Sequence, residues 1–249
     1  MNLLQFLRFQ CIKSTSFFSR YVFFLRDFTD FHQMNQNDGR FTLYFQDQYP
    51  CLSDNTETTG FDAHYIYHPA WAARIVKHIN PKKHIDISST LTFCSILSAF
   101  VPVDFYDYRP AHLHLSNLHS KKGDLLHLPF PSQSVESLSC MHTIEHIGLG
   151  RYGDPLDAQG DLKAIAELKR VVKLGGSLIF VVPIGKPRIR FNAHRIYSYE
   201  QVMKYFDGFS LKEFTLLSDD TSKGLKKHAK QKLADEQVWG CGCFWFIKK

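Results

Sequence analysis

The stretch from residue 84 to residue 110 constrains the fold of this 249-residue chain more than any other. It begins with a short strand at residues 84–87, which is followed by two serines, a threonine and an apolar run at residues 91–100. A second strand, at residues 103–106, ends at Asp107. Strand, tight turn, helix and strand in this order are typical of the opening unit of a doubly wound parallel sheet. The stretch therefore predicts an α/β fold whose ligands bind beyond the carboxyl ends of the strands.

Acidic residues mark the carboxyl ends of the first three predicted strands. Asp86 lies near the end of the first strand, Asp107 ends the second, and Asp124 follows a third that ends near Lys122. A carboxylate about 20 residues after the first turn is well placed to accept hydrogen bonds from ribose hydroxyls. The pattern predicts an adenosine-type cofactor. The alternative is an α/β protein whose strand ends carry aspartate without such a role.

The alternation of strands and helices continues along the chain. We expect further strands at residues 135–140, 177–182, 211–217 and 242–247, and helices at residues 161–172 and 198–206. Ser198 and Gln201 have the spacing of a capping box that opens the second of these helices. Residues 219–236 are polar and rich in lysine, so we expect a solvated excursion there.

The region before the first strand predicts two domains, an aromatic-rich helical arm and loop at residues 1–60 and an α/β domain at residues 61–249. Aromatic residues recur at helical spacing along the arm and form an apolar face. The preferred interpretation is an arm that packs on its own domain or on the twin in a homodimer. The alternative is an interfacial helix in peripheral contact with a membrane. Residues 40–45 are expected to form a short strand.

A helix is also expected immediately before the first strand. It runs from Ala70 to Lys77, because Pro69 suits a first helical turn and the Asn80-Pro81 pair stops a helix.

The composition is that of a globular protein, with 44% hydrophobic and 22% charged residues. A formal net charge of +6 suits a phosphate-bearing or acidic small molecule, or an anionic membrane surface. The basic residues form no compact stripe interleaved with stacking aromatics, so we expect no nucleic-acid partner. The six scattered cysteines, with Cys94 and Cys140 inside apolar runs, predict a reduced, cytoplasmic setting.

Two histidine and cysteine patterns raise the question of a metal. His142, Glu145 and His146 match the H-x-x-E-H pattern of zinc proteases, but that chemistry needs the middle of a helix, and here the pattern follows a strand. Cys241 and Cys243 alternate on the last strand and face the same way. Paired small core residues are the preferred interpretation, and a metal or redox role is the alternative. We therefore predict no metal site.

Taken together, the motifs resemble those of class I S-adenosylmethionine-dependent methyltransferases. The matching segments are HIDISS, GDLLHLPF, the strand that ends in MHTIEH, and LKRVVKLGGSLIFVVP. The segments EHIGLGRYGDPLDAQGD and FNAHRIYS are more similar still to an uncharacterised branch of that superfamily, a domain of unknown function. The resemblance covers about residues 62–247. It implies a Rossmann-like doubly wound, mostly parallel sheet of seven strands with a reversed C-terminal hairpin.

The resemblance also implies S-adenosylmethionine as the cofactor, with residues of the first three strand ends around it. Asp86 and Ser88 would lie under its methionine part. Asp107 would hold the ribose hydroxyls, and Asp124 and Leu125 would meet the adenine.

By the same resemblance, Glu145 and His146 would border the site of methyl transfer. A hydroxyl acceptor benefits from a base within hydrogen-bond reach, which is worth on the order of 10²–10⁴ in rate. We prefer His146 as that base, and Glu145, His142 and His194 are the alternatives.

Polar residues on two neighbouring loops form the predicted acceptor site. Arg151, Tyr152, Asn192, His194 and Arg195 offer a lining suited to sugars, phosphates or carboxylates. The alternative is that these residues lock the two loops to each other.

One departure from the family concerns the first turn, which is glycine-rich there and reads Ser88-Ser89-Thr90 here. A non-glycine residue in the left-handed region costs on the order of 1–2 kcal/mol. A micromolar cofactor contributes about 8 kcal/mol of binding free energy. We therefore expect the strain to weaken cofactor binding without abolishing it.

The leading hypothesis is a methyltransferase that acts on a small polar acceptor, such as a sugar or glycan precursor. The alternative is a non-catalytic protein of the same fold that serves as a binding or scaffold protein. A nicotinamide-dependent oxidoreductase would need G-x-G-x-x-G after the first strand, where this chain has DISSTL.

Overall fold

The computed structural model describes residues 3–36 and 38–249, with side chains from residue 17 onward. It divides into two compact units, residues 1–60 and residues 61–249. The described residues include no helix that combines the length and the hydropathy needed to cross a bilayer.

The first unit consists of a long helix, α1 (Leu3–Asn35), and a loop with one 3-10 turn, Phe45–Asp47. The expected strand at residues 40–45 is wrong. The segment has no partner strand, and Phe45 instead packs edge-on against Phe28 of α1, with ring centroids 5.6 Å apart. The helical arm itself is confirmed. Its packing on a homodimer twin or on a membrane stays a prediction.

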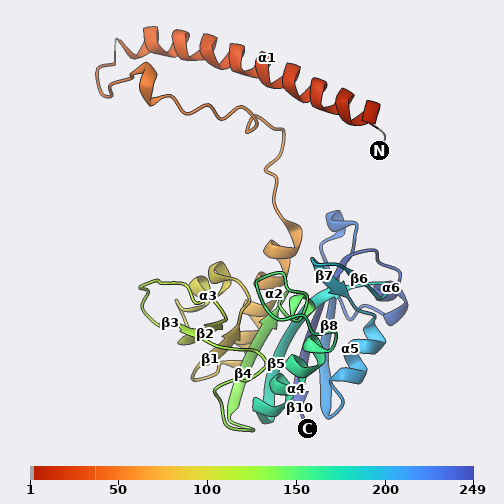
Figure 1. Cartoon of the computed structure of the whole chain (residues 1–249). Helices are drawn as coiled ribbons and strands as arrows, with labels where there is room; N and C mark the ends of the chain where they lie inside the picture. The colour runs from red at the N-terminus through yellow and green to blue at the C-terminus, as the bar shows by residue number, and fades with distance from the viewer. Residues whose placement is uncertain (1–2, 37) are drawn as a thin grey trace. The chain divides into compact units, whose positions relative to one another are not determined.

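The second unit is built on an eight-stranded sheet with the order β3-β2-β1-β4-β5-β10-β8-β9 (Figure 1). The strands are β1 (His84–Ile87), β2 (Val103–Asp107), β3 (Leu118–Lys122), β4 (Val135–Met141), β5 (Val172–Ile184), β8 (Phe209–Leu217), β9 (Leu225–Lys227) and β10 (Gly240–Lys248). Strands β1 to β5 pair in parallel, whereas β10 runs antiparallel to both of its neighbours. This confirms the predicted doubly wound sheet with a reversed C-terminal hairpin.

The sheet has one strand more than the seven predicted, because the polar segment 219–236 returns to the sheet. Within it, β9 pairs antiparallel with β8, and Leu225 lies opposite Leu217 in the register. A short helix, α6 (Gln231–Asp235), follows, and its Leu233 packs on the core. The expectation of a purely solvated excursion is therefore wrong, since two of its leucines have apolar surface to bury.

Helices cover both faces of the sheet (Figure 1). One apolar cluster joins the sheet to α4 (Gly160–Val171) and α5 (Tyr199–Tyr205), and a second joins it to α2 (Ala63–Ile79) and α3 (Leu91–Leu97). Alternate residues of the central strands divide between the two clusters. In β5, for example, Phe180 belongs to the first and Ile179 to the second.

Helix α2 begins seven residues before the expected Ala70, at Ala63. The Asp62 carboxylate caps it by accepting a hydrogen bond from the Tyr65 amide at 3.3 Å. Pro69 consequently lies inside the helix, where its missing N–H removes one backbone hydrogen bond. His64, His68 and other side chains of the first turns are buried, and their burial offsets that loss, so the helix continues past the proline. The extra turns bring His64 and Tyr65 to the edge of the sheet at which the candidate site lies.

Candidate active site

A cavity of about 720 Å³ opens at the carboxyl edge of the parallel strands. Its wall combines residues at the ends of four strands with the start of α2 and the residue before β10: Ser88, Ser89, Asp107, Gly123, Asp124, His142, His64, Tyr65 and Trp239. The sheet order reverses between β1 and β4, which is where ligands bind in open α/β sheets. The volume lies within the range of small-molecule sites, about 300–1,000 Å³.

The first turn after β1 holds a left-handed residue without glycine. Ser88 has a φ of 53°, and its amide donates to the Tyr106 carbonyl oxygen at 2.8 Å. The Ser89 hydroxyl accepts from the Met141 amide at 3.1 Å, and Thr90 caps α3 by accepting from the Phe93 amide. The turn is thus tied to the neighbouring strands β2 and β4. These bonds hold a conformation that glycine would adopt without strain.

Three more of the predicted cofactor residues form one wall of the cavity. Asp107 and Asp124 both line it, and each accepts a hydrogen bond from a backbone amide two residues on, at 2.7 and 2.8 Å. Leu125 lies beside them and is buried. Gly123 lets the chain before Asp124 pass close to Tyr106 of β2, because a Cβ added to Gly123 would lie 3.0 Å from the Cβ of Tyr106.

Asp86, predicted to lie under the methionine part of the cofactor, is not among the residues that line the cavity. It is fully buried beneath the turn, where its carboxylate accepts from the Ser89 amide at 3.0 Å and from the Ser139 hydroxyl. Burial raises the pKa of Asp86 to about 6, although these hydrogen bonds oppose the shift. Ser139 also contacts His84, and burial lowers the pKa of that imidazole to about 3. Asp86 therefore supports the first turn from below.

His142 and Glu145 form a buried pair after β4. His142 has a φ of 52°, and its Nδ1 lies 2.8 Å from Oε1 of Glu145, whose exposed fraction is 1%. On the other side of the ring, Nε2 lies 3.4 Å from Sγ of Cys241. Burial alone would lower the pKa of His142, but the Cys241 sulfur and the Glu145 carboxylate outweigh it and raise the pKa to about 10. Glu145 therefore pairs with His142 and also contributes to the cavity wall.

His146 has the geometry of a base. Its Nδ1 lies 2.6 Å from the Ala193 carbonyl oxygen, and Arg151 donates to the same oxygen at 3.0 Å. A carbonyl oxygen can only accept, so Nδ1 carries the imidazole proton. Nε2 then has the lone pair that a base requires, and it lies 3.9 Å from Oε1 of Glu145.

Two guanidinium groups lie close to one aromatic ring on the cavity wall. The Tyr152 ring has Arg109 at 4.8 Å and Arg151 at 5.1 Å from its centroid, and all three residues line the cavity. The ring also meets His146 edge-on at 5.6 Å. Positive charge next to an aromatic face suits an acceptor that carries a carboxylate or a phosphate.

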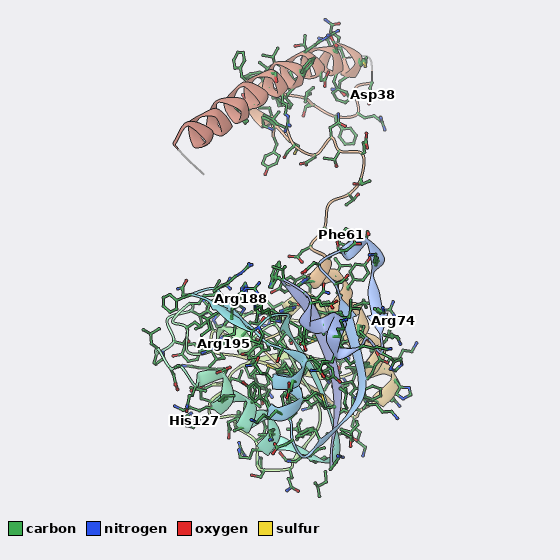
Figure 2. The ribbon with its side chains drawn as sticks, turned by 90° about the vertical axis from the view of Figure 1, so that its right-hand side faces the viewer. Asp38, Phe61, Arg74, His127, Arg188 and Arg195 are labelled. Carbon is green, nitrogen blue, oxygen red and sulfur yellow. The ribbon has the colours of Figure 1, made fainter. Side chains whose placement is uncertain are left out.

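Two of the predicted acceptor residues do not belong to the cavity wall. Arg195 comes from the hairpin of β6 (Arg188–Arg190) and β7 (His194–Ile196), whose Arg188 and Arg195 are labelled in Figure 2. The Arg195 side chain is buried, donates to the Ile147 carbonyl oxygen at 2.6 Å and lies 3.6 Å from the Asp161 carboxylate. Asn192 is exposed and outside the lining. Arg195 therefore locks two loops together, which was the alternative interpretation.

His194 does line the cavity, next to an aromatic residue that sequence reasoning missed. Trp239 lies between His194, with ring centroids 5.7 Å apart, and His64, at 4.6 Å. Burial lowers the pKa of His194. Tyr65 and Arg109 were also missed. The Asp62 cap was the one available signal for His64 and Tyr65, whereas nothing local marks Trp239.

The comparison with family models gives one match. A model described as "Caenorhabditis protein of unknown function, DUF268" matches residues 131–239. This span contains both segments that suggested an uncharacterised branch, so the match agrees with that resemblance. No curated protein matches the sequence.

Solved structures give the class of fold. A 1,6-didemethyltoxoflavin-N1-methyltransferase from Burkholderia thailandensis, with bound 1,6-didemethyltoxoflavin and S-adenosylhomocysteine, has a TM-score of 0.53 at 9% identity over 73% of this chain and 78% of its own. The YcgJ protein from Bacillus subtilis has a TM-score of 0.52 at 15% identity, over 73% of this chain and 98% of its own. A putative methyltransferase from Haloferax volcanii, solved with the Trm112 activator, has 0.51 at 14%, over 75% and 90%.

At these identities the likeness concerns the fold. The fold is that of the class I S-adenosylmethionine-dependent methyltransferases.

Proposed function

We propose that this chain is an S-adenosylmethionine-dependent methyltransferase that acts on a small, polar, negatively charged acceptor. One observation carries the proposal. A single cavity joins a wall of strand-end carboxylates, Asp107 and Asp124, to a wall that holds an imidazole base, His146. Similarity of fold alone would not supply this combination.

The carboxylate wall suits the cofactor. Asp107 lies at the end of β2, where a carboxylate can accept hydrogen bonds from ribose hydroxyls. Leu125 offers apolar surface next to it for the adenine, and the turn at Ser88 and Ser89 also lines the cavity. When bound, the cofactor would supply a methyl carbon on a sulfonium as the electrophile, and S-adenosylhomocysteine, a neutral thioether, would be the leaving group.

The opposite wall manages the acceptor. His146 is held by the Ala193 carbonyl oxygen so that Nε2 can take the proton of an acceptor hydroxyl or amine. Arg109 and Arg151 hold a negative group of the acceptor, and the Tyr152 ring packs against its apolar part. The protein's contribution is alignment, and positioning alone can supply roughly 7–11 kcal/mol of a barrier.

A second candidate function is a non-catalytic protein that binds small molecules with the same fold. The observation in its favour is Ser88, since a side chain and a strained φ of 53° stand where the turn approaches the cavity. This candidate predicts no stabilisation by the cofactor or its demethylated product.

Thermal unfolding with and without S-adenosylhomocysteine separates the two. A ligand at 100 times its dissociation constant stabilises by about 2.7 kcal/mol. We expect a clear rise in Tm for the native chain and none for Asp107→Ala. Asp207→Ala is the matched control, because that carboxylate is exposed, lies outside the cavity lining and pairs with Lys169. Absence of a rise at millimolar ligand in the native chain would refute the proposal.

The base assignment has its own test in His146→Gln. This variant should keep the stabilisation by S-adenosylhomocysteine, because His146 belongs to the acceptor wall. In a methyl-transfer assay with a panel of hydroxylated and aminated carboxylates and phosphates, kcat should fall by about 10²–10⁴. An unchanged kcat at every pH would remove His146 from the mechanism.

A further inference from the structure

Beside the cavity lies a cluster of buried histidine and cysteine side chains that the proposed methyl transfer does not use. His64 comes from the first turn of α2, His142 follows β4, and Cys241 belongs to β10. All three are buried, and each offers one ligand atom that lies within 4.8 Å of the other two. We propose that these three residues bind a single transition-metal ion, with zinc as the best chemical fit.

The spacing requires little rearrangement. In a tetrahedral zinc site, bonds of about 2.0–2.3 Å place nitrogen and sulfur ligands roughly 3.3–3.6 Å apart. Nε2 of His142 and Sγ of Cys241 already lie 3.4 Å apart. An ion would take the place of the proton between them, and rotation of the His64 ring would complete the triangle.

Glu145 orients the central ligand from behind. Its Oε1 lies 2.8 Å from Nδ1 of His142, so it accepts that proton and leaves Nε2 directed toward Cys241. A carboxylate on the outer nitrogen of a metal-bound histidine is the usual supporting contact, because it fixes the tautomer and raises the basicity of the ring. This gives a reason for the burial of the Glu145 carboxylate beside a histidine.

Two histidine nitrogens in this region have no partner among the described residues. Nδ1 of His64 and Nε2 of His68 are both buried without a hydrogen bond. In His68 the Nδ1 proton goes to the His64 carbonyl oxygen at 2.6 Å, so its Nε2 carries a lone pair. Buried polar atoms without a partner are rare because they are costly, and their presence here points to an absent ligand.

The donor set and the surroundings favour a particular class of ion. A thiolate with two imidazoles suits zinc and is unsuited to magnesium or calcium, which prefer oxygen ligands. His64 and His142 line the cavity, which gives the ion a path from solvent. Three protein ligands leave one position open, and Sγ of Cys243, 3.7 Å from that of Cys241, adds a second thiol nearby.

The site can be tested without the cofactor or an acceptor by titrating the chelator-treated chain with cobalt(II) under a non-coordinating reductant. The absorption spectrum of bound cobalt(II) identifies its ligands, since a bound thiolate gives a near-ultraviolet charge-transfer band and a tetrahedral site gives intense visible bands. We expect saturation at a single ion per chain and displacement by zinc. Absence of these bands in the native chain would overturn the proposal.

Variants assign the bands to residues. Cys241→Ser should lose the charge-transfer band, whereas Cys94→Ser, which removes a buried thiol of α3, should keep it. Glu145→Gln should keep the band and weaken affinity about 10–100-fold, as expected for a supporting contact. A band that persists in Cys241→Ser would overturn the assignment.

If Cys241→Ser does not fold, His64→Gln decides, because this residue lies at the start of α2 and outside the sheet. We expect its cobalt affinity to fall at least about 10-fold, as for loss of a metal ligand or its support. Unchanged affinity and unchanged visible bands in His64→Gln would exclude the three-residue site.

Discussion

The replacement Asp86→Asn should change the pH dependence of stability in a way that isolates one buried carboxyl group. Burial raises the pKa of Asp86 from its ordinary 3.8 to about 6 in the folded chain. Between these two values the folded state holds a proton that the unfolded state has lost. The free energy of unfolding therefore falls as pH rises through this window, and the penalty is constant above about pH 6.

The structure sets the magnitude of that penalty. A shift from 3.8 to about 6 is roughly two pKa units, which at about 1.4 kcal/mol per unit amounts to about 3 kcal/mol. Asparagine has no such titration. It can still accept from the Ser89 amide, and its Nδ2 can donate to Ser139 if that hydroxyl turns toward His84, 2.8 Å away.

Urea unfolding of both chains at a series of pH values measures the effect. The stability of Asp86→Asn relative to the native chain should rise by about 2–3 kcal/mol between pH 4 and pH 7, whatever the constant offset between them. Ser139→Ala removes a donor to the Asp86 carboxylate, which should raise the pKa of Asp86 further. The free energy of unfolding of this variant should therefore keep falling to a higher pH than that of the native chain. Parallel curves for Asp86→Asn and the native chain would refute the argument.

Two further predictions concern residues at the turn and the hairpin. Arg195→Ala leaves the Asp161 carboxylate buried without its cation, so the free energy of unfolding should fall by about 3–5 kcal/mol, whereas exposed Arg190→Ala should stay within about 0.5 kcal/mol. A small loss in Arg195→Ala with abolished acceptor binding would restore the predicted acceptor role. Ser88→Gly removes a left-handed strain of about 1–2 kcal/mol and adds about 0.5–1 kcal/mol of chain entropy cost, so urea unfolding should show a net gain of up to about 1.5 kcal/mol. A net loss there would mean that the Ser88 hydroxyl contact with Tyr106 outweighs the strain.

The fold could be predicted because its signals are local. Strand β2 ends at the predicted Asp107, and several helices begin at a side-chain cap. The Ser198 capping box, for example, is present as expected. The short strand β9 could not be predicted in the same way. Its pairing depends on Leu225 meeting Leu217 of β8, which is a contact between elements and leaves no mark on either segment alone.

The candidate site divides along the same line. Asp107 ends β2, and Asp124 and His146 come shortly after β3 and β4, so the rule that strand ends share one edge was enough to predict their place. Trp239 and His64 reach the cavity through β10 and α2, which approach that edge from distant parts of the chain. Arg195 shows the opposite case. It follows β5, as expected, but the direction of its side chain depends on the β6–β7 hairpin, which the sequence did not indicate.

In the H-x-x-E-H pattern, the sequence spacing of His142 and His146 does not determine the directions in which their rings point. On a regular helix, His142 and His146 would share a face and could bind one ion together. Here His142 takes a left-handed φ of 52° and a 3-10 turn follows, so the two rings diverge. His142 turns toward Cys241, and His146 turns toward the Ala193 carbonyl oxygen. One turn of chain thereby supplies a proposed base on one side and a proposed metal ligand on the other, and Glu145 lies between them within 2.8 Å and 3.9 Å of the two rings. Because Glu145 contacts both, Glu145→Gln should alter metal affinity and the pH profile of methyl transfer together, whereas Cys241→Ser should alter the first and leave the imidazole contact of His146 in place.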